Sequence, residues 1–494
     1  MGRSLVAPFH LHSGEGFNSL SSGEEPGFRA FTGYILLNMD KTKKNSRILI
    51  LLFVGVLMGA LDISIVGPAI PSIEKSIRVI ERDLSWIFSI YVLFNLVGIP
   101  LMARLSDIHG RRWIYVASVA IFGIGSVVVA LSHDITFLLI GRAIQGFGAS
   151  GIFPVASATI GDVFPIEKRG RALGLIGAVF GVAFILGPFI AGFMLLWFDW
   201  HSLFLINLPV AAVLIVMAAR LLPGHTGGEK PVIDWGGIVM LAVVLSAFTL
   251  GVNFIRIENI PNSLGSWPVL PLMFLVFILT PILVMYERKQ KDSILNIRLF
   301  RSRQIRLVGF IAFGLGLFQS SIVFLPKMAV DLFHVLPSKA SFMLLPLVIA
   351  TAIGSPLTGR LLDKTGSRII VVSGLGIATV ALFYLSLVSG NFTLFYAAEA
   401  GLGLGLTMRS SLNYIMLNEV SAKERASVQG MVIIFVSTGQ LTGAALVGAI
   451  TTVSPGEKVS FGPAFLVMAA LSALLLVLAF FLKRRREENA KINF

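Results

Sequence analysis

The segment ARLSDIHGRR, residues 103–112, decides the fold, because it returns later in the chain as GRLLDKTGSR, residues 359–368. Three pairs of residues match at a constant offset of 256 positions: Asp107 and Asp363, Gly110 and Gly366, Arg112 and Arg368. The same offset relates four further pairs: Arg169 and Arg425, Gly174 and Gly430, Gly187 and Gly443, Gly192 and Gly448. A register held over about 90 residues indicates that the chain contains two copies of one structural unit.

Around these segments the sequence consists of long apolar runs separated by short polar loops. Hydrophobic residues make up 55% of the chain and charged residues only 13%, whereas ordinary globular domains carry about 25% charged residues. The runs have the length of about 20 residues that a helix needs to cross the hydrocarbon core of a bilayer. We therefore predict fourteen membrane-spanning helices: 48–70, 84–102, 113–131, 136–158, 173–196, 202–222, 235–254, 267–286, 307–326, 337–358, 369–388, 393–416, 428–451 and 461–482.

The distribution of Lys and Arg predicts the orientation of these spans. Of the 40 basic residues, 31 fall on the face that carries both termini and 7 on the opposite face, while Arg142 and Arg409 lie inside predicted spans. Cytoplasmic loops of membrane proteins are enriched in Lys and Arg. Both termini are therefore expected in the cytoplasm, in a protein of the inner (cytoplasmic) membrane. This bias also accounts for the net charge of +14 without a nucleic-acid partner.

The spans and the repeat divide the chain into five parts. The first 38 residues are expected to be a disordered tail or to result from an over-extended start site. The five parts are a cytoplasmic N-terminal tail (1–47) that includes these 38 residues, an N-terminal six-helix bundle (48–222), two additional spans with a basic linker (223–306), a C-terminal six-helix bundle (307–482) and a basic cytoplasmic tail (483–494).

Several functions are excluded by residues that the sequence lacks. There is no cysteine, so disulfides, thiolate chemistry and Cys-ligated metals are ruled out. There is no Gly-Lys dipeptide, so the chain cannot form the phosphate-binding loop of an ATPase. No His pair has the spacing of a metal site. We expect no enzyme activity, no metal or other cofactor and no ATPase partner, so that transport energy would come from a proton or substrate gradient. A monomer is expected.

The repeated segment has the composition of a conformational hinge. Its carboxylate can bind neighbouring backbone amides and guanidinium groups in one conformation and lose them in another. A positively charged anchor with a tight turn is the simpler alternative. The candidate hinge residues are Asp107, Gly110, Arg111, Arg112, Gly359, Asp363, Gly366 and Arg368.

Two charged residues lie deep inside predicted spans of the first bundle. Asp62 lies in LDISIVGPAIP (61–71), and Arg142 lies in GRAIQGFGAS (141–150). Because an unpaired guanidinium inside a membrane is costly, Arg142 is expected to face a cavity or a partner. Burial favours the neutral form of a carboxyl and a nearby guanidinium favours the charged form, so we predict that Asp62 is the proton-coupling group and Arg142 tunes it. The alternatives are that Asp62 only bonds to Ser64 or to backbone amides, and that Arg142 extends to the outer surface.

The fifth predicted span, GAVFGVAFILGPFIAG (177–192), is rich in small residues. With 100° of rotation per residue, several of them share one helix face, where a second helix can approach closely. We predict a tight contact there between the two halves that seals against proton leakage, with ordinary small-residue packing as the alternative. The residues of this motif are Gly177, Gly181, Gly187, Pro188 and Gly192.

Together these motifs resemble the major facilitator superfamily over essentially the whole chain after residue 45. Segments 61–71 and DWHSLFLINLPV (199–210) are similar to patterns of its fourteen-spanner drug:proton antiporter branch, and segment 177–192 resembles the motif that marks antiporters in this superfamily. The resemblance implies an all-α membrane protein with the major-facilitator fold, in which two six-helix bundles form a parallel pseudo-repeat and two extra helices lie centrally in the sequence. Ala103 departs from the family's Gly. Arg409 departs from the expected apolar residue or Pro, which argues against a purely cationic drug substrate.

The second bundle contains further polar candidates. Glu399 and Arg409 lie ten residues apart in YAAEAGLGLGLTMRSSLN (396–413), about 15 Å along a helix, and are not expected to pair. Glu399 is a candidate proton site or a contact for a cationic substrate, unless it lies among the outer headgroups. Lys327 and Asp331 form either an external gate or two solvated charges. Weaker candidates for lining a cavity are Gln145, Gln319, Arg409 and Gln440.

We expect a secondary active transporter that exports amphipathic or cationic drugs and related small molecules in exchange for protons. Its two halves would give alternating access to a central cavity. Its partners would be the small-molecule substrate, protons and the lipid bilayer. Three alternatives remain: export of a lipid, fatty acid or other endogenous amphiphile, uptake by symport, and a membrane sensor or assembly partner without transport.

Overall fold

The structure, a computed structural model, describes residues 26–77, 81–224, 234–255, 263, 265–290, 297–420, 425–451, 461–485 and 487. The chain divides into two compact units, Met1–Arg47 and Ile48–Phe494, and the contacts described below lie within the second unit. All regular structure in the described ranges is helical.

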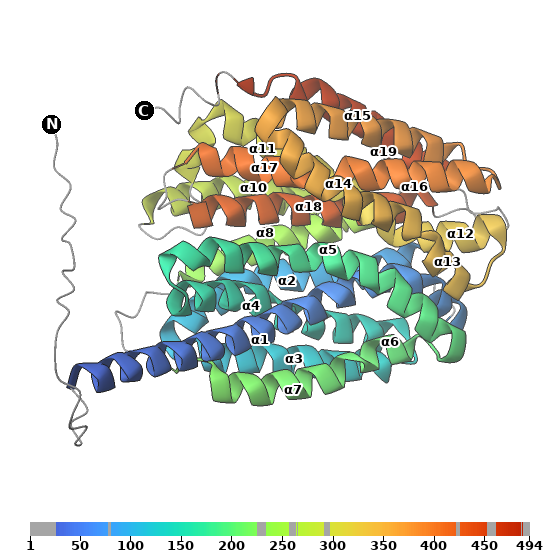
Figure 1. The fold of residues 1–494 in the computed structure, drawn as a ribbon. Coiled ribbons are helices and arrows are strands. Elements are labelled where there is room, and N and C mark those ends of the chain that lie inside the picture. The colour runs from blue at the N-terminus through green and yellow to red at the C-terminus, as the bar shows by residue number, and fades with distance from the viewer. Residues whose placement is uncertain are drawn as a thin grey trace. The chain divides into compact units, whose positions relative to one another are not determined.

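Figure 1 shows the arrangement of the helices. In chain order they are α1 (Pro26–Ile77), α2 (Glu81–His109), α3 (Arg111–Ala130), α4 (Ile135–Val163), α5 (Ile166–Trp197), α6 (His201–Leu205), α7 (Asn207–Leu221), α8 (Trp235–Phe254), α10 (Val269–Lys289), η2 (Ile297–Arg301), α11 (Arg303–Ser321), η3 (Ile322–Phe324), α12 (Leu325–Phe333), α13 (Pro337–Met343), α14 (Leu345–Thr365), α15 (Ser367–Ser386), α16 (Phe392–Leu406), α17 (Arg409–Asn418), α18 (Arg425–Thr451) and α19 (Gly462–Ala479).

Among the described residues, twelve helices are long and apolar enough to cross a membrane. The predicted count of fourteen is not confirmed by this criterion, and the difference concerns the fifth and twelfth predicted spans. The fifth lies within α5, where the described apolar segment is the shorter Leu186–Trp197. The twelfth is divided into α16 and α17 by a break at Thr407 and Met408. The break lies where the apolar run meets the polar residues at the start of α17. The hydroxyl groups of Thr407 and of Thr358 on α14 form a hydrogen bond of 2.8 Å there.

Helix α1 begins at Pro26, inside the tail that was predicted to be disordered over residues 1–38. Proline is well suited to the first position of a helix, because its missing N–H would have no partner there. Residues 1–25 of the predicted tail lie outside the described part of the chain.

The predicted repeat is visible in the backbone of the two hinges. Gly110 and Gly366 both have positive φ angles, 91° and 85°, which glycine adopts without the steric cost of a Cβ. The Gly110 N–H donates to the Ser106 carbonyl at 3.1 Å, and the Gly366 N–H donates to the Leu362 carbonyl at 3.0 Å. Since these four residues form two pairs at the repeat offset, the two connections have the same local structure.

The repeat extends to a contact between helices. In the first copy a Cβ on Gly187 of α5 would lie 2.6 Å from the Cβ of Ser64 on α1, and in the second copy Gly443 of α18 is pressed in the same way against Ser320 on α11. Ser64 donates to the Leu61 carbonyl, and Ser320 donates to the Leu317 carbonyl, the equivalent position. Each half thus joins its first and fifth helices through one Ser–Gly contact.

The two halves, residues 48–221 and 303–479, contact each other along several helices. Within Ile48–Phe494, Figure 1 shows α2–α7 grouped together in blue to green, and α11–α19 as a second group in yellow to red. Across the boundary α2 packs against α18, and α5 packs against α13 and α14. Helix α8, one of the two extra spans, contacts both α2 and α18, whereas α10 packs against α8 and exposes most of its surface.

Candidate functional site

The first half encloses an ion pair between its first and fourth helices. Arg142 Nη1 on α4 lies 2.5 Å from Asp62 Oδ2 on α1, and neither side chain is exposed. Helix α4 is positioned by glycines that bring its backbone against its neighbours: a Cβ on Gly141 would lie 2.7 Å from the backbone nitrogen of Val129 on α3. This close packing lets the long Arg142 side chain reach the interior of the half.

Two amide side chains complete the surroundings of Asp62. Gln145 Nε2 and Asn207 Nδ2 each donate to Asp62 Oδ1 at 3.1 Å. Gln145 also accepts from Arg142 Nη1 at 2.9 Å, and both amides donate to the hydroxyl of Ser126 on α3. Asp62 is an acceptor in all of these contacts, which is the role of an ionised carboxylate.

Arg142 is held independently of Asp62 as well. Its Nε donates to the Ile87 carbonyl of α2 at 3.1 Å, and its guanidinium carbon lies 4.3 Å from the centre of the Tyr91 ring. Its Nη2 is buried without a hydrogen-bond partner among the described residues. A cation against an aromatic face is stabilised by the ring quadrupole, so Arg142 can stay in place when the charge on Asp62 changes.

The structure shows which groups the two charged residues contact. Ser64 donates to the carbonyls of Leu61 and Ala183, while Asp62 accepts from side chains of α4 and α7. Arg142 is fully buried and paired, so it does not extend to the surface. Gln145, predicted as a weak cavity residue, instead belongs to the Asp62 site.

The first predicted hinge forms an ionic cluster. Arg111 pairs with Asp107 and lies 3.0 Å from Asp162 at the end of α4. Arg112 Nε donates to the Leu222 carbonyl after α7 at 2.7 Å. In the second hinge, the guanidinium of Arg485 donates to the Lys364 carbonyl beside Gly366. The predicted hinge residue Asp363 lies outside the described side chains.

The motif of α5 contacts both halves. Gly187 packs on Ser64 of α1, and a Cβ on Gly192 would lie 2.9 Å from the ring of Phe342 on α13 in the other half. Phe342 also packs edge-to-face against Phe189 of α5, with ring centres 6.0 Å apart. The side-chain surroundings of the predicted motif residues Gly177 and Gly181 lie outside the described part of the structure.

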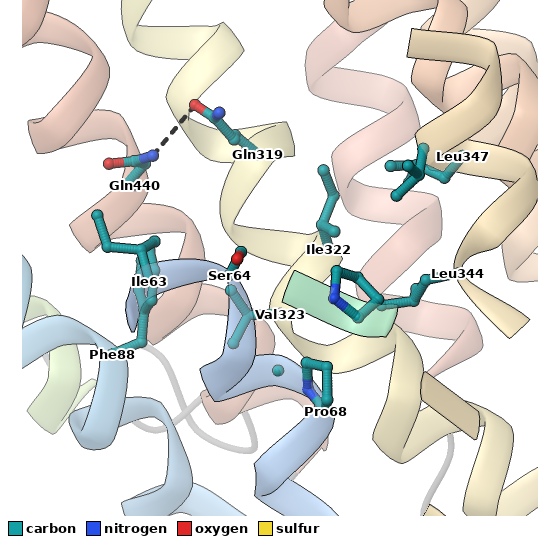
Figure 2. A pocket seen from close by; sticks show the side chains of 13 residues that line it. Ile63, Ser64, Pro68, Phe88, Gln319, Ile322, Val323, Leu344, Leu347 and Gln440 are labelled. Carbon is teal, nitrogen blue, oxygen red and sulfur yellow. Dashed lines mark hydrogen bonds between the residues drawn. The ribbon is translucent and has the colours of Figure 1, made fainter. Parts of the chain in front are cut away.

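A small cavity lies between the halves (Figure 2). It is lined mainly by apolar side chains, with the polar groups of Ser64, Gln319 and Gln440. Gln440 Nε2 donates to Gln319 Oε1 at 3.1 Å, so two predicted lining residues meet there, and Figure 2 shows them pointing toward each other. The cavity volume of about 30 Å³ suffices for water but is far below the roughly 300–1,000 Å³ of drug-sized sites.

Glu399 of α16 is isolated. It is fully buried, and neither carboxylate oxygen has a hydrogen-bond partner among the described residues. The Glu399 side chain is therefore enclosed by protein in this conformation. Arg409 lies at the start of α17, half-buried, and the described contacts contain no ion pair between it and Glu399. Arg409 is not among the residues that line the cavity.

Three side chains around Asp62 were not identified from the sequence: Asn207, Ser126 and Tyr91. Asn207 lies in the segment 199–210, whose pattern was noted without a role for the amide. Ser126 and Tyr91 resemble many other polar residues in apolar helices, and only the packing of α2, α3 and α4 brings them to the site.

The described residues form two repeated helical halves with apolar helices long enough to cross a membrane, and the first half encloses a buried ion pair. These features define a multi-pass membrane protein. The sequence pattern of the Major Facilitator Superfamily matches residues 52–349 and 307–493. The chain belongs to the Major Facilitator Superfamily.

Similar proteins agree with this assignment. The chain is 33% identical over 387 residues to the uncharacterized MFS-type transporter YfiU of Bacillus subtilis (strain 168), covering 76% of this chain and 74% of that one. It is 28% identical over 414 residues to Multidrug resistance protein 3 of the same organism, covering 81% and 78%. The crystal structure of a mutant of the nucleoside transporter NupG shares the fold, with a TM-score of 0.64, 14% identity and coverage of 88% and 99%. Other relatives are named triacylglyceride and riboflavin transporters.

Proposed function

We propose that the protein exports amphipathic or cationic small molecules in exchange for protons, with Asp62 as the principal proton-coupling group. The observation that carries this proposal is the enclosed Asp62–Arg142 pair. The site occupies one half only, since the residue at the repeat offset from Asp62 is the buried Phe318. A proton taken up by Asp62 would cancel one charge of the pair and leave Arg142 held by Ile87 and Tyr91.

A proton can drive transport only if it binds the two conformations with different free energies. In the conformation seen here the ionised Asp62 has donors from Arg142, Gln145 and Asn207. Separation of the donors in a second conformation would favour the protonated acid. We propose that the hinge residues Asp107 and Arg111 change partners in the same movement, which the contacts of Arg111 with Asp107 and with Asp162 of α4 support.

Glu399 is proposed as a second group that carries a proton or contacts a substrate cation. A buried carboxylate without partners is strongly disfavoured, so the neutral acid fits the surroundings described here. A cationic substrate or an approaching donor in another conformation would favour ionisation. Glu399→Gln removes this function while conserving side-chain shape.

Export of a lipid or other endogenous amphiphile is the second candidate. The mostly apolar lining of the cavity supports it, as does the presence of a triacylglyceride transporter among the relatives. The experiment that tests the proposal is transport into proteoliposomes under an imposed pH gradient, with fluorescent drug cations and labelled lipids as parallel substrates. Cation transport abolished by a proton ionophore supports drug:proton antiport. Lipid transport that is insensitive to the gradient contradicts it.

The proposed location is the cell membrane, with both termini in the cytoplasm. The excess of basic residues on the face that carries the termini supports this orientation. The protein is proposed to act as a monomer without a bound cofactor.

A further inference from the structure

A second ionic cluster lies at the end of the bundle where α1 terminates. Lys327 Nζ on α12 lies 2.7 Å from Glu74 Oε2 on α1 and 3.0 Å from Asp331 Oδ2 on α12. The Lys327 side chain is only 5% exposed, whereas those of Glu74 and Asp331 are 25% and 27% exposed. The side chain that carries the ammonium group is thus enclosed by protein, whereas the two acidic side chains are partly exposed at the protein surface.

These two ion pairs of Lys327 connect different parts of the molecule. Glu74 belongs to the first half, while Lys327 and Asp331 belong to the second. The Glu74–Lys327 pair therefore joins the halves, and the Lys327–Asp331 pair stays within one of them. By contrast, the Asp62–Arg142 and Arg111–Asp162 pairs each lie within the first half.

In the same region the backbone of α1 in the first half lies close to the backbone of η3 in the second half. A Cβ on Gly67 of α1 would lie 2.9 Å from the carbonyl oxygen of Val323 in η3. Gly67 and Val323 also line the small central cavity. Glu74 follows Gly67 by about two helical turns and Lys327 follows Val323 by about one, so the ionic cluster lies beyond the cavity toward this end of the bundle.

We infer that the Glu74–Lys327 ion pair is a latch that holds the two halves together at this end and keeps the central cavity closed there. The inference rests on the alternating access of the proposed function, and the charge distribution predicts that this end faces outside. When the halves separate, Glu74 becomes hydrated and Lys327 keeps Asp331 as its partner.

The second partner is what makes the latch reversible. A buried charge that loses its only partner is strongly destabilised, and such a contact would resist opening. Because Asp331 moves with Lys327, opening removes one attraction and leaves no isolated ammonium group. Neutralising Lys327 or Glu74 should therefore favour the open state, whereas neutralising Asp331 should not.

The absence of cysteine from the native sequence allows a direct test. A single Ile322→Cys substitution places a reporter thiol at the cavity wall, where Ile322 is 8% exposed. A membrane-impermeant maleimide is added to the outside of right-side-out vesicles, and the labelling rate is measured for the parent, Lys327→Met, Glu74→Gln and Asp331→Asn. The first two substitutions should accelerate labelling about tenfold, a usual size for conformational coupling. Asp331→Asn should slow labelling rather than accelerate it, because the open state then loses the attraction between Asp331 and Lys327.

The double variant Lys327→Met with Glu74→Gln should label no faster than either single variant, because both remove the same contact. Equal labelling in all variants would overturn the latch. So would acceleration by Asp331→Asn equal to that by Glu74→Gln, or labelling only from the cytoplasmic side. Glu74→Gln conserves shape at a partly exposed position, so it remains informative if Lys327→Met fails to fold. Labelling requires neither substrate nor a pH gradient, so failure of proton-coupled transport would leave this result intact.

Discussion

Asp62 on α1 and Arg142 on α4 are separated by 80 positions in the sequence and form an ion pair of 2.5 Å with no exposure of either side chain. Each residue accounts for the burial of the other, because charges in a protein interior need a partner. Gln145 and Asn207 add hydrogen bonds to the same carboxylate. A change in the charge of Asp62 must therefore alter the contacts among α1, α4 and α7.

Removing Arg142 alone should be more harmful than removing both charges of this pair. Arg142→Met leaves the Asp62 charge buried, and a loss of about 3–5 kcal/mol in unfolding free energy is expected. The double variant Asp62→Asn with Arg142→Met should recover part of that loss. Thermal unfolding in detergent micelles measures both effects, and strictly additive losses would show that the two side chains do not interact.

Asn207 should contribute to proton-driven transport through its bond to Asp62. Asn207→Leu conserves size and removes a hydrogen bond to a charged group, which is worth about 1.5–3 kcal/mol. The pH-driven transport rate should fall by roughly 10- to 100-fold, since 1.4 kcal/mol corresponds to a factor of ten. Asn253→Leu on α8 makes the same change where the amide bonds to Ser85 and Thr249. Equal losses in both variants would contradict a specific role for Asn207.

Position 187, where Gly187 packs on Ser64, should not tolerate a residue larger than glycine. Gly187→Val places atoms where Ser64 lies, and overpacking typically costs about 1–3 kcal/mol. A lower unfolding temperature is expected. Gly376→Val on α15 is the control, because nothing lies within 4 Å of a Cβ there. Comparable unfolding temperatures for the two variants would show that α1 and α5 can separate freely at this point.

The ion pair of the first hinge should affect the rate of the transport cycle more than the free energy of unfolding. Asp107→Asn weakens the contact to Arg111, which keeps Asp162, and a partly exposed pair contributes about 1 kcal/mol or less. Transport should slow while the unfolding temperature stays near that of the parent. Asp199→Asn changes an exposed carboxyl elsewhere and should leave transport unchanged. Normal transport by Asp107→Asn would make the hinge a passive turn.

The parts of the fold that depend on local sequence were predictable. The offset between the two hinge segments reappears as matching backbone angles at Gly110 and Gly366. Apolar length predicted most spans, because a membrane helix must satisfy its backbone groups internally. The break before Arg409 was missed, since hydropathy averages over Thr407 and Met408 and does not register their change to hydrogen bonds with the third preceding residue.

Contacts between distant segments were less predictable. The positions of Asp62 and Arg142 inside apolar runs indicated a shared site, but the hydrogen bonds of Asn207 depend on how α6 and α7 meet α1. Lys327 was recognised as a possible gate, whereas its partner Glu74 lies in a polar segment at the end of α1 with no distinctive pattern. Only the packing of the two halves brings Lys327 Nζ to within 2.7 Å of Glu74 Oε2.

The central claim is that Asp62 couples proton movement to transport, and the most direct measurement compares the parent with Asp62→Asn in the same proteoliposomes. Substrate exchange is measured first without a pH gradient and then with one imposed. The account predicts that Asp62→Asn retains exchange and no longer responds to the gradient. Gradient-driven accumulation by Asp62→Asn at the parent rate would contradict it.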